Sequence, residues 1–157
     1  MFKNGPIEGI EVRSLNKYSD GRGWLTELFR SDDINKEHIP VMTYVSMTKP
    51  GVARGPHEHT DQADYFCFVG PSEFKVYLWD NRKGSVTYMN KTAYVAGESA
   101  PAVVIVPKGV VHAYKNIGDR DGFVINCPNR LFKGEGKKDA VDEVRYENMA
   151  DSPYELD

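Results

Sequence analysis

The sequence has only two cysteines, no long apolar run and no cluster of basic residues among its 157 amino acids. No apolar stretch approaches the ~18 residues that a membrane-spanning helix needs. The first residues lack the apolar core of a signal peptide. A net charge of -3 and a pI near 5.8 argue against a surface built for nucleic acid. We therefore expect a cytoplasmic protein with no membrane partner and no nucleic-acid partner.

The scarcity of cysteine also bears on the redox state of the protein. Cys67 and Cys127 each lie in an apolar, strand-like run. Two cysteines without a signal peptide are more typical of reduced core residues than of a disulfide. We expect both thiols to be free and inside the core.

What the sequence does contain is a succession of short β-prone runs separated by polar turns, with almost no helical periodicity. This pattern predicts an all-β protein, a jelly-roll β-barrel with little helix. A single domain would cover residues 1–157, with the barrel over about 1–128 and a C-terminal loop or strap over 129–157. We expect strands at residues 7–15, 22–30, 41–48, 63–69, 74–80, 85–90, 103–106, 111–116 and 122–126.

Two separate stretches contain three of the four histidines. His57 and His59 are one residue apart, so in an extended chain both project from the same face. His112 follows a Pro-Gly turn in a distant run. A barrel of this size encloses one ligand among its inward-facing residues, and we place the three histidines there.

Both stretches are similar to the cupin sequence motifs. Gly51-x5-His57-x-His59-x4-Asp64-x5-Gly70 is close to the first motif, with Asp where Glu is usual. Pro107-x-Gly109-x2-His112-x3-Asn116 matches the core of the second, although Pro101 stands where a glycine is expected. Three imidazoles and a carboxylate suit a divalent transition metal, so one candidate metal site is His57, His59, Asp64 and His112. Alternatively, the Pro-Gly-His turn only shapes the entry to a strand.

A second interpretation needs no metal. A histidine that faces an enclosed cavity can titrate near neutral pH and take a proton from a carbon beside a carbonyl group. Guanidinium groups bind phosphate through paired donors, so Arg22, Arg54 and Arg82 are candidates to hold a diphosphate.

Four blocks of the sequence resemble the dTDP-4-dehydrorhamnose 3,5-epimerase family and occur in family order. They are Asp20-Gly21-Arg22-Gly23-Trp24-Leu25-Thr26-Glu27, Gly51-Val52-Ala53-Arg54-Gly55-Pro56-His57, Trp79-Asp80-Asn81-Arg82-Lys83-Gly84-Ser85 and Val106-Pro107-Lys108-Gly109-Val110-Val111-His112. The resemblance implies a cupin-type jelly roll, a homodimer and an epimerase without metal or redox cofactor. Such an enzyme removes protons beside the 4-keto group of a dTDP-sugar.

The resemblance also implies roles for individual residues. His57 matches the catalytic base, and Asp151 is the candidate for the carboxylate that orients it. Arg54 matches an arginine near the nucleotide diphosphate. Arg22 and Glu27 match residues of the nucleotide and substrate pocket, and His112 matches a second cavity histidine.

The sequence departs from the family pattern at functional positions. Asp64 stands where the family has a lysine that stabilises the enolate, and an anion there opposes the developing negative charge. Met42-Thr43-Tyr44 replaces a Gln-x-Asn pair. The family has a tyrosine that reprotonates the substrate, and this chain has Ile125 or Asn126 at about that position. A later tyrosine of the family corresponds to a position near Phe132.

We therefore predict an epimerase or isomerase of a nucleotide-linked keto-sugar, acting by proton abstraction beside the keto group. Two alternatives stay open at this point. One is a metal-binding cupin enzyme, and the other is a sugar-binding cupin that has lost its chemistry.

Overall fold

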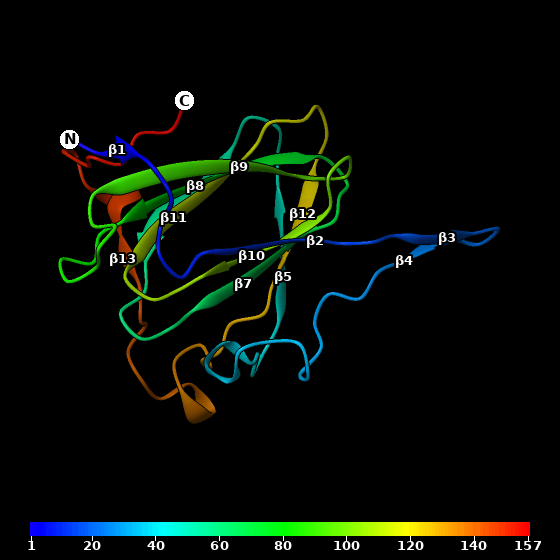
Figure 1. The fold of residues 1–157 in the computed structure, drawn as a ribbon, viewed down its shortest axis with the longest axis horizontal. Helices are drawn as coiled ribbons and strands as arrows, with labels where there is room; N and C mark the ends of the chain where they lie inside the picture. Colours follow the sequence, from blue (N-terminus) through cyan, green and yellow to red (C-terminus); the bar gives the residue numbers. More distant parts are fainter.

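Two β-sheets form the body of the protein in the computed structural model, which describes residues 1–157 (Figure 1). The three helical segments are single 3-10 turns, η1 (Lys36–His38), η2 (Glu135–Lys137) and η3 (Tyr146–Asn148). The all-β prediction is confirmed. The strands are β1 (Lys3–Asn4), β2 (Glu11–Ser14), β3 (Tyr18–Asp20), β4 (Gly23–Leu25), β5 (Tyr44–Thr48), β6 (Ala53–Glu58), β7 (Asp64–Phe68), β8 (Glu73–Asp80), β9 (Asn90–Gly97), β10 (Ala102–Val106), β11 (Val110–Asn116), β12 (Gly122–Asn126) and β13 (Val144–Arg145).

The strand order divides the chain between two opposing walls. The six-stranded sheet has the order β1-β9-β8-β11-β6-β13, and the five-stranded sheet has the order β2-β10-β7-β12-β5. All strand pairs are antiparallel except β1 with β9. The hairpin of β3 and β4 belongs to neither sheet. From β5 to β12, consecutive strands therefore alternate between the two walls, as in a jelly roll, except for β8 and β9, which pair within one sheet.

Alternating side chains fill the space between the two sheets. In β7, Phe66 and Phe68 belong to the inner core, whereas Tyr65 and Cys67 belong to a cluster on the outer face. The inner side chains pack with those of β8 and β11 from the opposite sheet, including Leu78. Burying a side chain of this size contributes about 1.5–3 kcal/mol, so the shared core holds the two sheets together.

Both sheets are also covered on their outer faces. Leu28 and Ile34 pack over the outer side of the five-stranded sheet. Tyr154 and Leu156, near the C-terminus, pack over Tyr77 of the six-stranded sheet and its apolar neighbours. Coverage on both faces explains why these strands are continuous apolar runs in the sequence. Cys67 and Cys127 are buried and free, as expected.

The N-terminal strand predictions need correction. Of residues 7–15 only β2 is extended in a sheet, and of residues 22–30 only β4 is a strand. β4 pairs with β3 in a hairpin that projects from the body of the molecule (Figure 1). The apolar pattern was misleading here because Trp24 and Leu25 are 51% and 64% exposed and join no core of their own chain.

The strand expected at residues 85–90 is also wrong. β9 begins only at Asn90, and the preceding loop folds over the buried carboxylate of Asp80. That carboxylate accepts hydrogen bonds from the hydroxyl groups of Ser85 and Thr87 and from the guanidinium of Arg82. These local bonds compete with strand pairing.

No helix of the structure has the length and apolarity of a membrane span.

We expect Asp80→Asn to lower the free energy of unfolding by about 2–3 kcal/mol at neutral pH, because an amide cannot accept all of these hydrogen bonds. Burial alone would raise the pKa of Asp80, but bonds from Arg82, Thr87 and Ser85 lower it to about 2. The carboxylate therefore stabilises the fold above about pH 4, and this contribution disappears as the pH falls through its native pKa. Urea unfolding of both proteins at several pH values measures the difference.

The control is Asp121→Asn, which changes an exposed aspartate. Its stability should equal that of the wild type across the same pH range. A variant at position 80 that is as stable as the wild type at pH 7 would contradict the structural role of this carboxylate.

Candidate active site

His57 and His112 face each other on neighbouring strands. β6 and β11 pair with these residues in register, and their ring centroids are 4.5 Å apart. The approach requires glycine at position 55, where φ is +84° and a Cβ would lie 2.6 Å from the carbonyl oxygen of His112. The glycine before Pro56 therefore sets the spacing of the two imidazoles.

A buried carboxylate, Asp64, lies between two of the imidazoles. Its Oδ2 atom is 3.2 Å from Nε2 of His59 and 3.1 Å from Nε2 of His112. The other ring nitrogens point to backbone oxygens. Nδ1 of His112 is 3.1 Å from the carbonyl oxygen of Val110, and Nδ1 of His59 contacts the carbonyl oxygen of Asp142. Both rings are thus held from two sides.

These contacts give the three groups different charges. Burial alone would raise the pKa of Asp64, but hydrogen bonds with His112 and His59 hold it well below its usual range. Burial alone would lower the pKa of His59, but its bond to Asp64 and the charge of that carboxylate raise it to about 9. Burial and then the neighbouring His112 lower the pKa of His57 to about 2. At neutral pH, Asp64 and His59 form an ion pair and His57 is a neutral imidazole.

The second oxygen of Asp64 extends this network into the five-stranded sheet. Oδ1 accepts hydrogen bonds of 2.8 Å from the side-chain amides of Gln62 and Asn126. The amide nitrogen of Asn126 also donates to the hydroxyl oxygen of Tyr44, at 2.9 Å. The network therefore links the histidines of one wall to a phenol on the other.

The C-terminal strap, residues 129–157, fixes the loop that follows His59. The side chain of Asp142 accepts hydrogen bonds of 2.9 Å from the backbone N–H groups of Thr60, Asp61 and Gln62. β13 then pairs with β6 and places Arg145 opposite His57. The strap is thus joined to the same strand and loop that hold His57 and His59.

Glu143, rather than Asp151, is the carboxylate beside His57. Its Oε1 atom lies 3.7 Å from Nδ1 of His57, and both side chains are 15% exposed. Asp151 is exposed in a turn beyond β13 and takes part in no ion pair. β13 brings residues 143–145, and not the later turn, alongside β6, so Glu143 lies where the resemblance implies that Asp151 would be.

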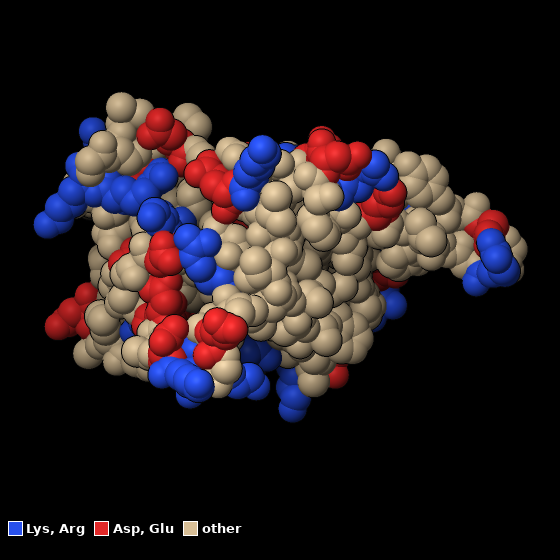
Figure 2. Space-filling view, turned by 90° about the horizontal axis from the view of Figure 1, so that it is seen from below, with Lys and Arg blue, Asp and Glu red and all other residues tan.

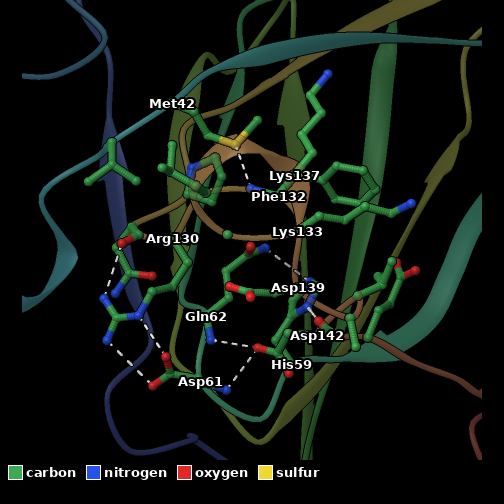
Figure 3. Close-up of a pocket in the computed structure, with 18 of the residues that line it drawn as sticks. Met42, His59, Asp61, Gln62, Arg130, Phe132, Lys133, Lys137, Asp139 and Asp142 are labelled. Atoms are coloured by element: carbon green, nitrogen blue, oxygen red, sulfur yellow. Dashed lines mark hydrogen bonds and ion pairs between the residues drawn. The ribbon is translucent and has the colours of Figure 1, made fainter.

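A cavity of about 1150 Å³ opens beside these residues (Figure 3). Its barrel wall includes Tyr44, Arg54, His57 and His59, and its other wall is the strap together with the preceding Pro128. In Figure 3, His59 and Asp61 lie at one end of the cavity, whereas Lys133 and Lys137 lie at the other. The cavity therefore has a histidine at one end and two lysines at the other.

Five lysine and arginine side chains line this cavity, and three of them have no carboxylate partner. Arg130 pairs with Asp61, and Arg145 pairs with Glu143. The unpaired cations are Arg54, Lys133 and Lys137. Arg54 donates instead to the hydroxyl group of Thr48 and the carbonyl oxygen of Met47. Its charge is free to interact with a bound anion.

The structure brings together most of the predicted site residues: His57, His59, Asp64, His112 and Arg54. It places three others away from the cavity of their own chain. Arg22 is exposed at the tip of the β3–β4 hairpin and pairs with Asp20, and Glu27 is exposed and pairs with Arg30. Arg82 is committed to the buried Asp80 and lies outside the cavity lining.

Sequence reasoning missed Tyr44, Asn126, Asp142 and Glu143. The position of Tyr44 could have been predicted, because alternate residues of a strand share a face and Ser46 and Thr48 of β5 face inward. The strap residues gave no signal, since their partners lie about 80 positions earlier in the chain.

Comparison with known proteins places this architecture among sugar epimerases. The sequence pattern of the family described as dTDP-4-dehydrorhamnose 3,5-epimerase matches residues 4–142. The probable low-salt glycan biosynthesis epimerase Agl13 of Haloferax volcanii is 40% identical over 131 residues, which are 82% of this chain and 83% of that protein. The spore coat polysaccharide biosynthesis protein SpsL of Bacillus subtilis is 36% identical over 113 residues, 72% of this chain and 74% of that protein.

A solved structure supports the same fold. The dTDP sugar isomerase of Desulfovibrio desulfuricans superposes with a TM-score of 0.81 at 20% identity, covering 95% of this chain and 91% of the other. The predicted cupin-type fold is confirmed by this likeness.

Proposed function

Because the chain belongs to the dTDP-4-dehydrorhamnose 3,5-epimerase family, we propose that it epimerises a nucleotide-linked keto-sugar with His57 as the base. One observation carries the residue assignment. His57 lies on the cavity wall with a carboxylate 3.7 Å from its Nδ1 atom, and burial, followed by the neighbouring His112, lowers its pKa and so favours the neutral imidazole. A neutral imidazole has the free lone pair that proton abstraction requires.

Glu143 supports this role of His57. When the imidazole takes a proton from the carbon beside the keto group, it becomes a cation, and the electron pair of the broken C–H bond moves to the keto oxygen as an enolate. A carboxylate 3.7 Å from Nδ1 favours that cation. Glu143 is held in turn by Arg145, which fixes its position on the strap.

The lysine-rich end of the cavity suits the diphosphate of the substrate. Lys133 and Lys137 lie at this end and Arg54 lines the same cavity, so three charges without carboxylate partners are available to a nucleoside diphosphate, which carries the opposite sign. The cavity volume of about 1150 Å³ exceeds the roughly 300–1,000 Å³ of an ordinary small-ligand site, as a bulky sugar nucleotide needs. We place the diphosphate there and the keto-sugar beside His57.

The substrate class follows from the family. Relatives are named as glycan or polysaccharide biosynthesis proteins, and a structural neighbour is named as a dTDP sugar isomerase. We propose a dTDP-linked 4-keto-6-deoxy sugar as the substrate, used to build a surface glycan.

A homodimer is part of the same proposal. The stem of the β3–β4 hairpin is largely uncharged in Figure 2, and its Tyr18, Trp24 and Leu25 are exposed. The five-stranded sheet ends at β5, whose outer residues Val45 and Met47 are exposed as well. Apolar surface of this extent favours a partner. A hairpin that crosses to a second copy would bring Arg22 to that copy's pocket.

A metal site is the second candidate, and the histidine cluster is the observation that favours it. One ligand atom from each of His57, His59 and His112 lies within 4.8 Å of the others, and Asp64 contacts two of the rings. This donor set fits a divalent transition metal. Such an ion would be held by these four residues and would polarise the keto oxygen, so His57 would be a ligand and not a base.

His57→Asn should lower the incorporation of solvent deuterium at the carbon beside the keto group by about 10²–10⁴-fold, because an amide cannot accept the proton. The measurement is mass spectrometry of a dTDP-4-keto-6-deoxy sugar incubated with enzyme in deuterium oxide. The variant should still bind dTDP, since the amide keeps much of the shape of the imidazole.

His38→Asn is the control, since His38 lies outside both the cavity lining and the cluster of His57, His59 and His112, and it should exchange at the wild-type rate. Elemental analysis of the wild type separates the two candidates. A near-stoichiometric transition metal that is lost in both His57→Asn and His59→Asn would contradict the role of His57 as base.

Saturating dTDP should raise the melting temperature, because a ligand at a hundredfold excess over its dissociation constant stabilises the native state by about 2.7 kcal/mol. Arg54→Ala and the double variant Lys133→Ala/Lys137→Ala should each reduce the shift. Lys138→Ala, next to this site but outside the cavity lining, should leave it unchanged. Equal shifts in all three variants would show that the diphosphate binds elsewhere.

Light scattering should give a mass of about twice 17.7 kDa for the wild type. Replacing Trp24 and Leu25 by serine should move the population towards monomer, because it removes exposed apolar area that a second copy would cover. Val86→Ser removes an apolar side chain that is 89% exposed on another loop and should have no effect. A wild-type monomer would refute the dimer.

A further inference from the structure

Tyr44 and His57 come from opposite sheets and line the same cavity. It is the first residue of β5 and shares the inward parity of Ser46 and Thr48, whereas Val45 and Met47 face outward. β5 belongs to the five-stranded sheet and β6, which contains His57, belongs to the six-stranded sheet. Both residues line the same cavity. A bound sugar therefore has an imidazole on one side and a phenol on the other.

The hydrogen bonds of Asn126 determine what this phenol can do. Oδ1 of Asn126 accepts a hydrogen bond of 3.1 Å from the backbone N–H of Tyr65. The side-chain amide nitrogen of Asn126 is therefore the atom that faces Asp64 and Tyr44. That nitrogen has two hydrogens, and it gives one to Asp64 and one to Tyr44. Tyr44 is thus the acceptor in this contact. Its own O–H group has no acceptor in the protein and is free to donate into the cavity.

We propose that Tyr44 is the proton donor that completes the epimerisation, on the face of the sugar opposite to His57. The inference rests on the proposed function and adds the second of the two groups that inversion needs. A single base that removes a proton and returns it to the same face leaves the configuration unchanged. Inversion requires a donor on the other face, and Tyr44 is the hydroxyl group that the opposite sheet presents to this cavity.

The proton transfers balance. His57 takes the proton from the carbon, and the electrons of that C–H bond form the enolate. The enolate carbon then forms a new bond to the proton of Tyr44 while the O–H bond of the phenol breaks. The products are an inverted keto-sugar, an imidazolium at position 57 and a phenolate at position 44. Proton exchange with water restores both side chains.

The surroundings of Tyr44 suit a donor. Burial, followed by the charge of Asp64, raises the pKa of Tyr44, so the phenol holds its proton until the enolate has formed. The phenolate that results keeps the N–H of Asn126 as a hydrogen-bond donor, which stabilises the new negative charge. Asn126 is itself oriented by a backbone group and by Asp64, so the position of the phenol is tied to the histidine network.

The test is Tyr44→Phe, studied in deuterium oxide with a dTDP-4-keto-6-deoxy sugar. His57 is intact in this variant, so deuterium should still enter the carbon beside the keto group with retention of configuration. Formation of the inverted epimer, followed by NMR, should fall by about 10²–10⁴-fold, the usual contribution of a general acid. Continued exchange also shows that the variant is folded. Tyr88→Phe, which changes a tyrosine outside the cavity, should invert at the wild-type rate.

The other outcomes overturn the inference in distinguishable ways. Inversion by Tyr44→Phe at the wild-type rate would refute the role of Tyr44 and leave the proposed function intact. Loss of both exchange and inversion in a folded Tyr44→Phe would place Tyr44 in the deprotonation step and refute its role as donor. A wild-type protein that neither exchanges nor inverts the sugar would refute the proposed function, and the inference with it.

Discussion

The organisation of this protein depends on one buried charge, the carboxylate of Asp64. A carboxylate that is 1% exposed is stable only when its oxygens are fully paired, and here two imidazoles hold one oxygen and two amides hold the other. These partners come from both sheets, so the same ion fixes the separation of the two cavity walls. This carboxylate raises the pKa of His59, whereas burial, followed by the neighbouring His112, lowers the pKa of His57, so the pair favours a cation at position 59 and a neutral imidazole at position 57.

The ion pair of Asp64 with His59 explains how an aspartate can stand at a position where the family has a lysine. The family pattern has a lysine where this chain has Asp64, and an anion near an enolate opposes the reaction. In the structure the aspartate is not a free anion, because it forms an ion pair with His59 in which both partners are largely removed from solvent. The local field that an incoming substrate meets is therefore that of the pair and of the unpaired cations along the cavity, and not that of a lone carboxylate.

The part of the site that could be predicted consists of residues whose neighbours are fixed by strand geometry. His57 and His59 share a face because strands have a period of two, and His112 joins them because a long β-protein of this size closes on itself. The central strands were predictable for the same reason. The projecting hairpin, the loop around Asp80 and the position of Glu143 were not, since each is decided by a side chain meeting a distant or buried group rather than by a local pattern.

The two walls of the cavity differ in how freely their residues can change during evolution. The barrel wall supplies the imidazoles and depends on the inner core, so substitutions there endanger folding. Residues 130–133 and 135–141 of the strap are exposed and belong to no core cluster, yet they form most of the wall that a nucleotide would touch. Changes in this segment alter the shape and charge of the cavity at little cost in stability. A lineage of such proteins could therefore acquire new sugar nucleotides by drift in one surface segment while its proton-transfer machinery stayed constant.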